Sequence, residues 1–236
     1  MSSAALALSR LRLRLNKTFL GFQLVFDLAL PVGYALLIGR TANPQEHLRL
    51  ATGAFLLGAT LSIMRLPAFV LMMERVFGTR DLLIAAGITR RDYIIANGFG
   101  GLYFAIFPFA AFAVTALVLH VPFPSAFGYW AVLALYMVTL HGAGLIIASA
   151  FKTFGPFTLT INLVLLATAT LCPVFYPPER VPDLIRPLVE FLPASLAAGL
   201  ALSVPQLDVA KLVVLCVWAI VCVSAGYVLL PWQRKR

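Results

Sequence analysis

The chain has 236 residues, of which 61% are hydrophobic and only 11% are charged, with a formal net charge of +9. A soluble domain is about a quarter charged, so this composition excludes a water-soluble globule. The basic residues stand in clusters between apolar runs, as in proteins that meet anionic lipid headgroups. We therefore expect the lipid bilayer as a partner and no nucleic acid.

Six apolar segments are long enough to cross a bilayer, which takes about 20 residues of helix. Helix is the expected form because lipid offers no hydrogen-bond partners to an unpaired backbone. The sequence thus predicts an all-α membrane protein with one transmembrane domain over residues 1–236. The expected spans are residues 19–39, 50–73, 94–120, 127–151, 156–175 and 209–230.

The loops carry their Lys and Arg residues unevenly. Twelve fall on the side of the two termini and five on the other side, while Arg65 lies within the second span. Positive charge marks the cytoplasmic side of membrane proteins. We expect a multi-pass protein of the cytoplasmic (plasma or inner) membrane with both termini inside.

Two segments outside the spans have patterns of their own. Around Ser9 to Lys17, basic residues and leucines alternate so that a helix would have one basic and one apolar face, which predicts an amphipathic helix on the membrane surface. The same alternation fits a strand, which is not expected alone at a bilayer. Six prolines divide residues 176–205, and these pieces predict two short external re-entrant helices.

The loop after the second span, residues 74–93, is unusually charged and encloses the apolar run Leu82–Ala86. Thr89 is a plausible cap for a helix that begins near Arg90. A short helix with an exposed apolar stripe favours a protein partner. The alternative is a connector that lies on the membrane.

No motif for catalysis or for ATP binding is present. The sequence lacks GxxxxGK[ST], HExxH, GxSxG and paired CxxC patterns. His47, His120 and His141 are far apart in sequence, so no metal site is expected from them. His141 is instead expected to pack between helices, and Gly98 and Gly101 are spaced for a close helix contact.

Asp27 and Arg65 are ionisable residues that fall well inside spans, where charge is expensive. Asp27 and Arg65 lie at a similar depth, ~12 Å from the inner boundary at 1.5 Å per residue, so a buried ion pair between spans one and two is one interpretation. Pro31 and Pro67 would kink both helices nearby. Alternatively, Arg65 snorkels to the surface and Asp27 is protonated or faces water.

Span five is unusually polar for a lipid-facing helix. Thr158, Asn162 and Thr170 are its notable polar residues. They either line a translocation path or form hydrogen bonds between helices, and the sequence leaves both interpretations open.

Two motifs resemble the permease subunits of the ABC-2 export family. The first runs from Glu74-Arg75-Val76-Phe77-Gly78-Thr79-Arg80-Asp81 through the apolar run to Thr89-Arg90-Arg91. The second is Pro173-Val174-Phe175-Tyr176-Pro177, where span five gives way to the external segment. The chain departs from the family pattern at Gly87, where many members have proline, and at Leu192-Pro193-Ala194-Ser195.

The resemblance implies a transport subunit that is not itself an enzyme. It would pair with a second copy or a paralogue, dock two ATP-binding cassette subunits that bind ATP and magnesium, and export an amphipathic drug, antibiotic, lipid or lipid-linked glycan. The path would be built largely from spans one, two and five. The residues that it implies for coupling to the ATPase are Glu74, Arg75, Gly78, Thr79, Arg80, Asp81, Leu82, Leu83, Thr89, Arg90 and Arg91. The alternatives are an intramembrane lipid-modifying enzyme and a non-transporting accessory subunit.

Overall fold

The computed structural model describes residues 17–40, 42–43, 46–176, 181–204 and 206–230, with the backbone alone for residues 17–24 and 26. Every regular element in these ranges is a helix, which confirms the all-α prediction. The amphipathic helix expected before residue 17 lies outside the described residues.

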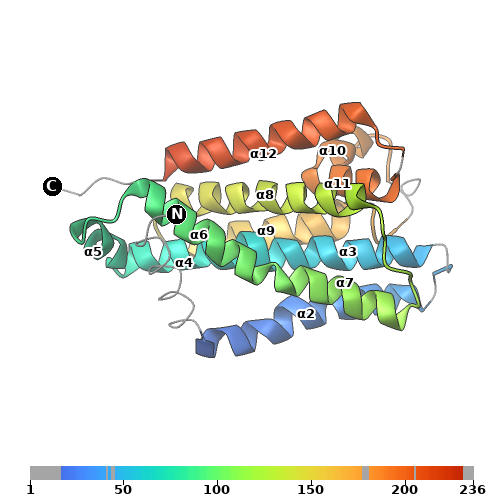
Figure 1. Cartoon of the computed structure of the whole chain (residues 1–236), viewed down its shortest axis with the longest axis horizontal. Coiled ribbons are helices and arrows are strands. Elements are labelled where there is room, and N and C mark those ends of the chain that lie inside the picture. The colour runs from blue at the N-terminus through green and yellow to red at the C-terminus, as the bar shows by residue number, and fades with distance from the viewer. Residues whose placement is uncertain (1–16, 41, 44–45, 177–180, 205, 231–236) are drawn as a thin grey trace.

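The long helices run side by side, with α5 at one end of the bundle and α10 and α11 at the other (Figure 1). We call these the α5 end and the cap end. The helices in chain order are α2 (Lys17–Gly39), α3 (His47–Ala59), η2 (Thr60–Arg65), α4 (Leu66–Val76), α5 (Thr79–Ala85), α6 (Arg90–Phe104), α7 (Ile106–Val118), α8 (Phe127–Ala150), α9 (Phe154–Leu171), α10 (Arg186–Phe191), α11 (Pro193–Leu202) and α12 (Val209–Leu229).

Five of these stretches are long and apolar enough to cross a membrane within the described residues: His47–Val76, Arg90–Val118, Phe127–Ala150, Phe154–Leu171 and Val209–Leu229. The chain is thus a multi-pass membrane protein. α2 has 23 residues, and its part from Asp27 to Gly39 forms a shorter apolar helix. The first of the six predicted spans therefore stays a prediction.

The second span contains a π-helical segment, η2, directly before Pro67. Proline has no N–H to bond four residues back, and its ring crowds the carbonyl there. One widened turn relieves that crowding without ending the helix. The third span is likewise interrupted, at Ala105, between α6 and α7.

Spans two and four form the centre of the fold through two hydroxyl pairs. The hydroxyls of Thr52 and Tyr129 are 2.8 Å apart, and those of Thr60 and Tyr136 are 2.9 Å apart. All four side chains are buried. Each pair satisfies polar atoms in an apolar interior, where an unpaired hydroxyl would be costly.

Glycines let α8 approach both of its long neighbours. A Cβ at Gly144 would lie 2.6 Å from the Met64 carbonyl oxygen, and one at Gly142 would lie 2.5 Å from the Cys222 backbone. Any larger side chain would collide with a backbone. α8 therefore binds η2 on one side and α12 on the other at backbone distance.

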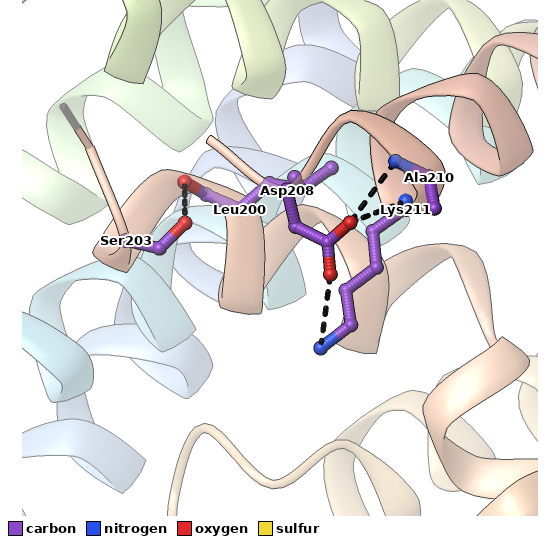
Figure 2. Close-up of polar contacts among 5 residues, drawn as sticks. All are labelled: Leu200, Ser203, Asp208, Ala210 and Lys211. Atoms are coloured by element: carbon purple, nitrogen blue, oxygen red, sulfur yellow. Dashed lines mark hydrogen bonds and ion pairs between the residues drawn. The ribbon is translucent and has the colours of Figure 1, made fainter. Parts of the chain in front are cut away.

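Residues 181–204 contain two short helices, α10 and α11, and their re-entrant position in a membrane stays a prediction. α11 is almost entirely buried against α8, α12 and α3. Asp208 then caps α12: its Oδ1 accepts from the N–H groups of Ala210 at 3.0 Å and Lys211 at 3.2 Å (Figure 2). This cap fixes where the last span begins.

Candidate functional site

The turns that flank α5 depend on two glycines with left-handed backbone. Gly78 precedes α5 with φ 71°, and Gly87 follows it with φ 82°. The N–H of Gly87 donates to the Ile84 carbonyl and that of Ile88 to the Leu83 carbonyl, both at 3.1 Å, which closes the helix in a Schellman motif. Proline cannot adopt this φ, which explains the departure from the family pattern at position 87.

Thr89 caps α6, as predicted from the sequence. Its hydroxyl oxygen accepts from the N–H of Asp92 at 3.1 Å and donates to the Asp92 carboxylate at 2.7 Å. The cap holds the start of span three directly after the turn at Gly87. Residues 74–93, which we call the α5 segment, are thereby held in place at both ends of α5.

Glu74 and Arg75 hold this segment to the spans. The Arg75 guanidinium donates to the carbonyls of Phe151 at 2.7 Å and Ser149 at 3.2 Å, at the C-terminal end of α8. Cations are stabilised there by the helix dipole. The Glu74 carboxylate accepts from the Tyr93 hydroxyl at the start of span three. Both charges therefore serve structure inside this chain.

Arg80 and Arg90 also lie against the protein. Arg80 is only 8% exposed, and Arg90 lies over the ring of Tyr227 in α12, 4.5 Å from its centroid. This cation–π contact joins the beginning of span three to the end of span six.

The remaining side chains at this end face outward and form what we call the α5 surface. Leu82 is 70% exposed and Phe77 is 68% exposed, which is unusual for large apolar groups outside the spans. Leu83 instead packs partly against the core. The α5 surface consists of Val76, Phe77, Thr79, Asp81, Leu82, Thr89 and Arg91.

Sequence reasoning missed Phe77 as a member of this surface. It stands within the quoted motif, directly before Gly78, and a bulky apolar residue in a charged loop was the available signal. The contacts of Arg75 and Arg90 had no such signal, because their partners are more than 70 positions away.

Asp27 is completely buried, and neither of its carboxylate oxygens has a hydrogen-bond partner. Arg65 is the charge that acts on it electrostatically. In the part of the chain that the structure describes, the two side chains do not come within 4.0 Å. Their pairing stays a prediction.

Span five is the least buried of the spanning helices. Only Phe157 and Ile161 of α9 are buried. Thr158, Asn162 and Thr170 are all exposed, and the Thr170 hydroxyl donates to the Leu166 carbonyl of its own helix at 2.7 Å. These polar groups therefore face away from the rest of this chain.

An apolar pocket of about 430 Å³ opens between η2, α6 and α8. Gly98 has nothing within 4 Å of the place where its Cβ would be. This glycine therefore lines the pocket and does not make the expected close helix contact. A Cβ on Gly101 would lie 3.2 Å from His141 Nδ1, so that glycine does provide close packing. Apart from His141, the lining can receive only hydrocarbon.

The described ranges contain no group of three or more His, Cys, Asp or Glu side chains that could hold a metal ion. The cysteines Cys172, Cys216 and Cys222 are free, and two of them are buried.

The apolar helical spans define a polytopic membrane protein that has an exposed apolar surface at its α5 end. A family model described as ABC-2 type transporter matches residues 4–204. The chain belongs to this family and is a membrane permease of an ABC transporter, a family whose members partner with ATP-binding cassette subunits. No curated protein sequence matches the chain.

Proposed function

We propose that this chain is the permease subunit of an ATP-driven exporter and that the α5 surface receives the ATP-binding cassette subunit. The observation that carries the proposal is the exposure of Leu82 and Phe77 on the α5 segment. Side-chain contacts hold this segment to spans two, three, four and six. Exposed apolar side chains on a rigidly held segment suit a docking site, because little conformational freedom is lost on binding. The α5 end is then cytoplasmic, in line with the distribution of positive charge.

The fastening suggests how movement is transmitted. Arg75 joins the end of span two to span four, Glu74 joins it to span three, and Arg90 joins span three to span six. A displacement of α5 by the ATPase therefore acts on several helices together. In this proposal Glu74, Arg75, Arg80 and Arg90 transmit force, while the α5 surface makes the contact.

We infer that a second copy or a paralogue packs against α9 and α2. An exposed Asn162 amide in hydrocarbon would lose its hydrogen bonds at a cost of several kcal/mol, whereas a polar path between two copies would solvate it. α2 offers a neighbouring exposed face with Val25, Leu30 and Leu37. Thr158, Asn162 and Thr170 would then line the path of the exported molecule.

An amphipathic cargo suits these surroundings. The path would present hydroxyls and an amide among leucines such as Leu159, Leu163 and Leu166. Such a lining matches molecules with both a polar and an apolar part. Stimulation of ATP hydrolysis across a panel of drugs, lipids and lipid-linked glycans tests this cargo class.

Co-purification tests the docking proposal. The wild-type chain, extracted in mild detergent, should bring down a soluble ATP-binding cassette protein, and Leu82→Asp should abolish this. Leu184→Asp is the matched control, because Leu184 is 93% exposed but lies at the cap end. Loss of the ATPase with both variants, or with neither, would refute docking at the α5 surface.

Cysteine cross-linking tests the dimer. A single cysteine at Leu163 of α9, in a background without the three native cysteines, should form a disulfide between copies. A cysteine at Val217, which is exposed on α12, is the control. Cross-linking through Val217 and not through Leu163 would contradict the proposed interface.

A further inference from the structure

Two histidines that are 73 positions apart line the same hollow at the cap end. His47 is the first residue of α3, and His120 follows the end of α7. Both line one pocket of about 360 Å³, together with Leu48, Leu119, Val121 and Pro122. The imidazoles are thus the main polar side chains of a largely apolar hollow.

The hydrogen bond of His47 fixes its tautomer. Its Nδ1 lies 3.0 Å from the Leu119 carbonyl oxygen. A carbonyl only accepts, so Nδ1 carries the proton and donates. Nε2, the other nitrogen of this ring, is then placed to bind a metal ion, as in metal-binding histidines whose other ring nitrogen donates to a carbonyl.

His120 is held close to that ring by the same peptide unit. The Leu119 carbonyl that binds His47 belongs to the peptide bond joining Leu119 to His120. His120 is exposed and has φ 54°, the only positive φ of a non-glycine residue in the described part of the chain.

The backbone at His120 would suit glycine better. The N–H of Val121 donates to the Ala116 carbonyl at 2.8 Å and that of His120 to the Leu117 carbonyl at 3.3 Å, so α7 ends in a Schellman motif. Glycine is the usual residue at this left-handed position. An imidazole kept in a conformation that costs backbone energy suggests use of the side chain.

We propose that His47 and His120 form a two-imidazole site for a divalent transition-metal ion such as Zn²⁺ or Ni²⁺. Imidazole nitrogen suits these ions, whereas Ca²⁺ and Mg²⁺ require oxygen ligands. The carbonyl end of α7 favours a cation beside it. Water, at about 30 Å³ per molecule, fits in the pocket to complete the coordination. The bound ion clamps the end of span three to the beginning of span two.

Isothermal titration with NiCl₂ and ZnCl₂ tests the site. The full chain, carrying a tag without histidine, is reconstituted in lipid nanodiscs. His47→Gln retains an amide that can donate to the Leu119 carbonyl, and His120→Gly fits the left-handed backbone, so both variants should fold. Loss of an outer-shell partner alone weakens metal binding by about 10–100-fold, so loss of either ligand should weaken it at least about tenfold.

The result expected is one ion per chain in the wild type, with binding unchanged in Cys216→Ser. Metal should also raise the unfolding temperature of the wild type and of Cys216→Ser but not of His120→Gly. No binding by the wild type, or binding by both histidine variants as tight as that of the wild type, overturns the proposal. So does inorganic phosphate that binds in a histidine-dependent manner where the metals do not.

Discussion

The guanidinium of Arg75 lies 2.7 Å from the carbonyl oxygen of Phe151 and closes the C-terminal end of α8 from the neighbouring span. The same side chain reaches the Ser149 carbonyl. One residue of the α5 segment thus satisfies backbone carbonyls that would otherwise lack partners where the fourth span ends. This contact is the most direct link between the α5 segment and the centre of the bundle.

Removal of this link should destabilise the protein. Arg75→Ala is expected to lower the free energy of unfolding by about 1.5–3 kcal/mol, the range for a hydrogen bond to a charged group. Arg75→Lys keeps the charge but loses the planar arrangement of donors of the guanidinium. Its free energy of unfolding should therefore lie between those of the wild type and of Arg75→Ala. Unfolding of the purified permease in detergent measures this, and an alanine variant as stable as the wild type would contradict the role of Arg75.

Gly144 should tolerate no side chain. A Cβ at this position would lie 2.6 Å from the Met64 carbonyl oxygen, so Gly144→Ala must push η2 away from α8. We expect a loss of about 1–3 kcal/mol. Gly155→Ala in α9 is the control, since nothing lies within 4 Å of its Cβ position. Equal stability of the two alanine variants would show that α8 and η2 are not packed as described.

The proposed pairing of Asp27 with Arg65 makes a prediction that separates it from a neutral carboxyl. If the pair forms, Asp27→Asn should destabilise the protein, because the half-buried Arg65 guanidinium loses the charge that compensates it. The exchanged double variant Asp27→Arg, Arg65→Asp should then recover part of the loss. A fully stable Asp27→Asn would instead indicate that Asp27 is protonated in the native protein.

For five of the six predicted spans the structure has a helix long and apolar enough to cross a membrane. These spans were predictable because hydrophobic length is the main sequence signal of a segment that enters lipid. Their interruptions were not. The sequence placed Pro67 in span two, but a kink, a break and a π-helical turn are all ways to accommodate a proline. The break at Ala105 lies three residues before Pro108, which cannot donate to the Phe104 carbonyl, but hydropathy alone does not distinguish a break from a kink.

The position of the α5 segment in the chain was predictable, but which of its side chains are exposed was not. Its glycines, its cap at Thr89 and its apolar run follow from local chemistry. Whether a charged residue there faces a partner or its own chain depends on distant groups: Arg75 needs the end of α8, and Arg90 needs Tyr227. The pocket that His47 and His120 share was missed for the same reason, because the two residues are far apart in the sequence.

ATP hydrolysis by the partner subunit tests the central claim most directly. The permease and its ATP-binding cassette protein are reconstituted together in lipid nanodiscs, and turnover is compared with and without the permease. The account predicts that the wild type and Leu184→Asp alter the ATPase rate, whereas Leu82→Asp leaves it at the level of the ATPase alone. A rate that is the same with the wild type, with Leu82→Asp and with no permease would contradict it.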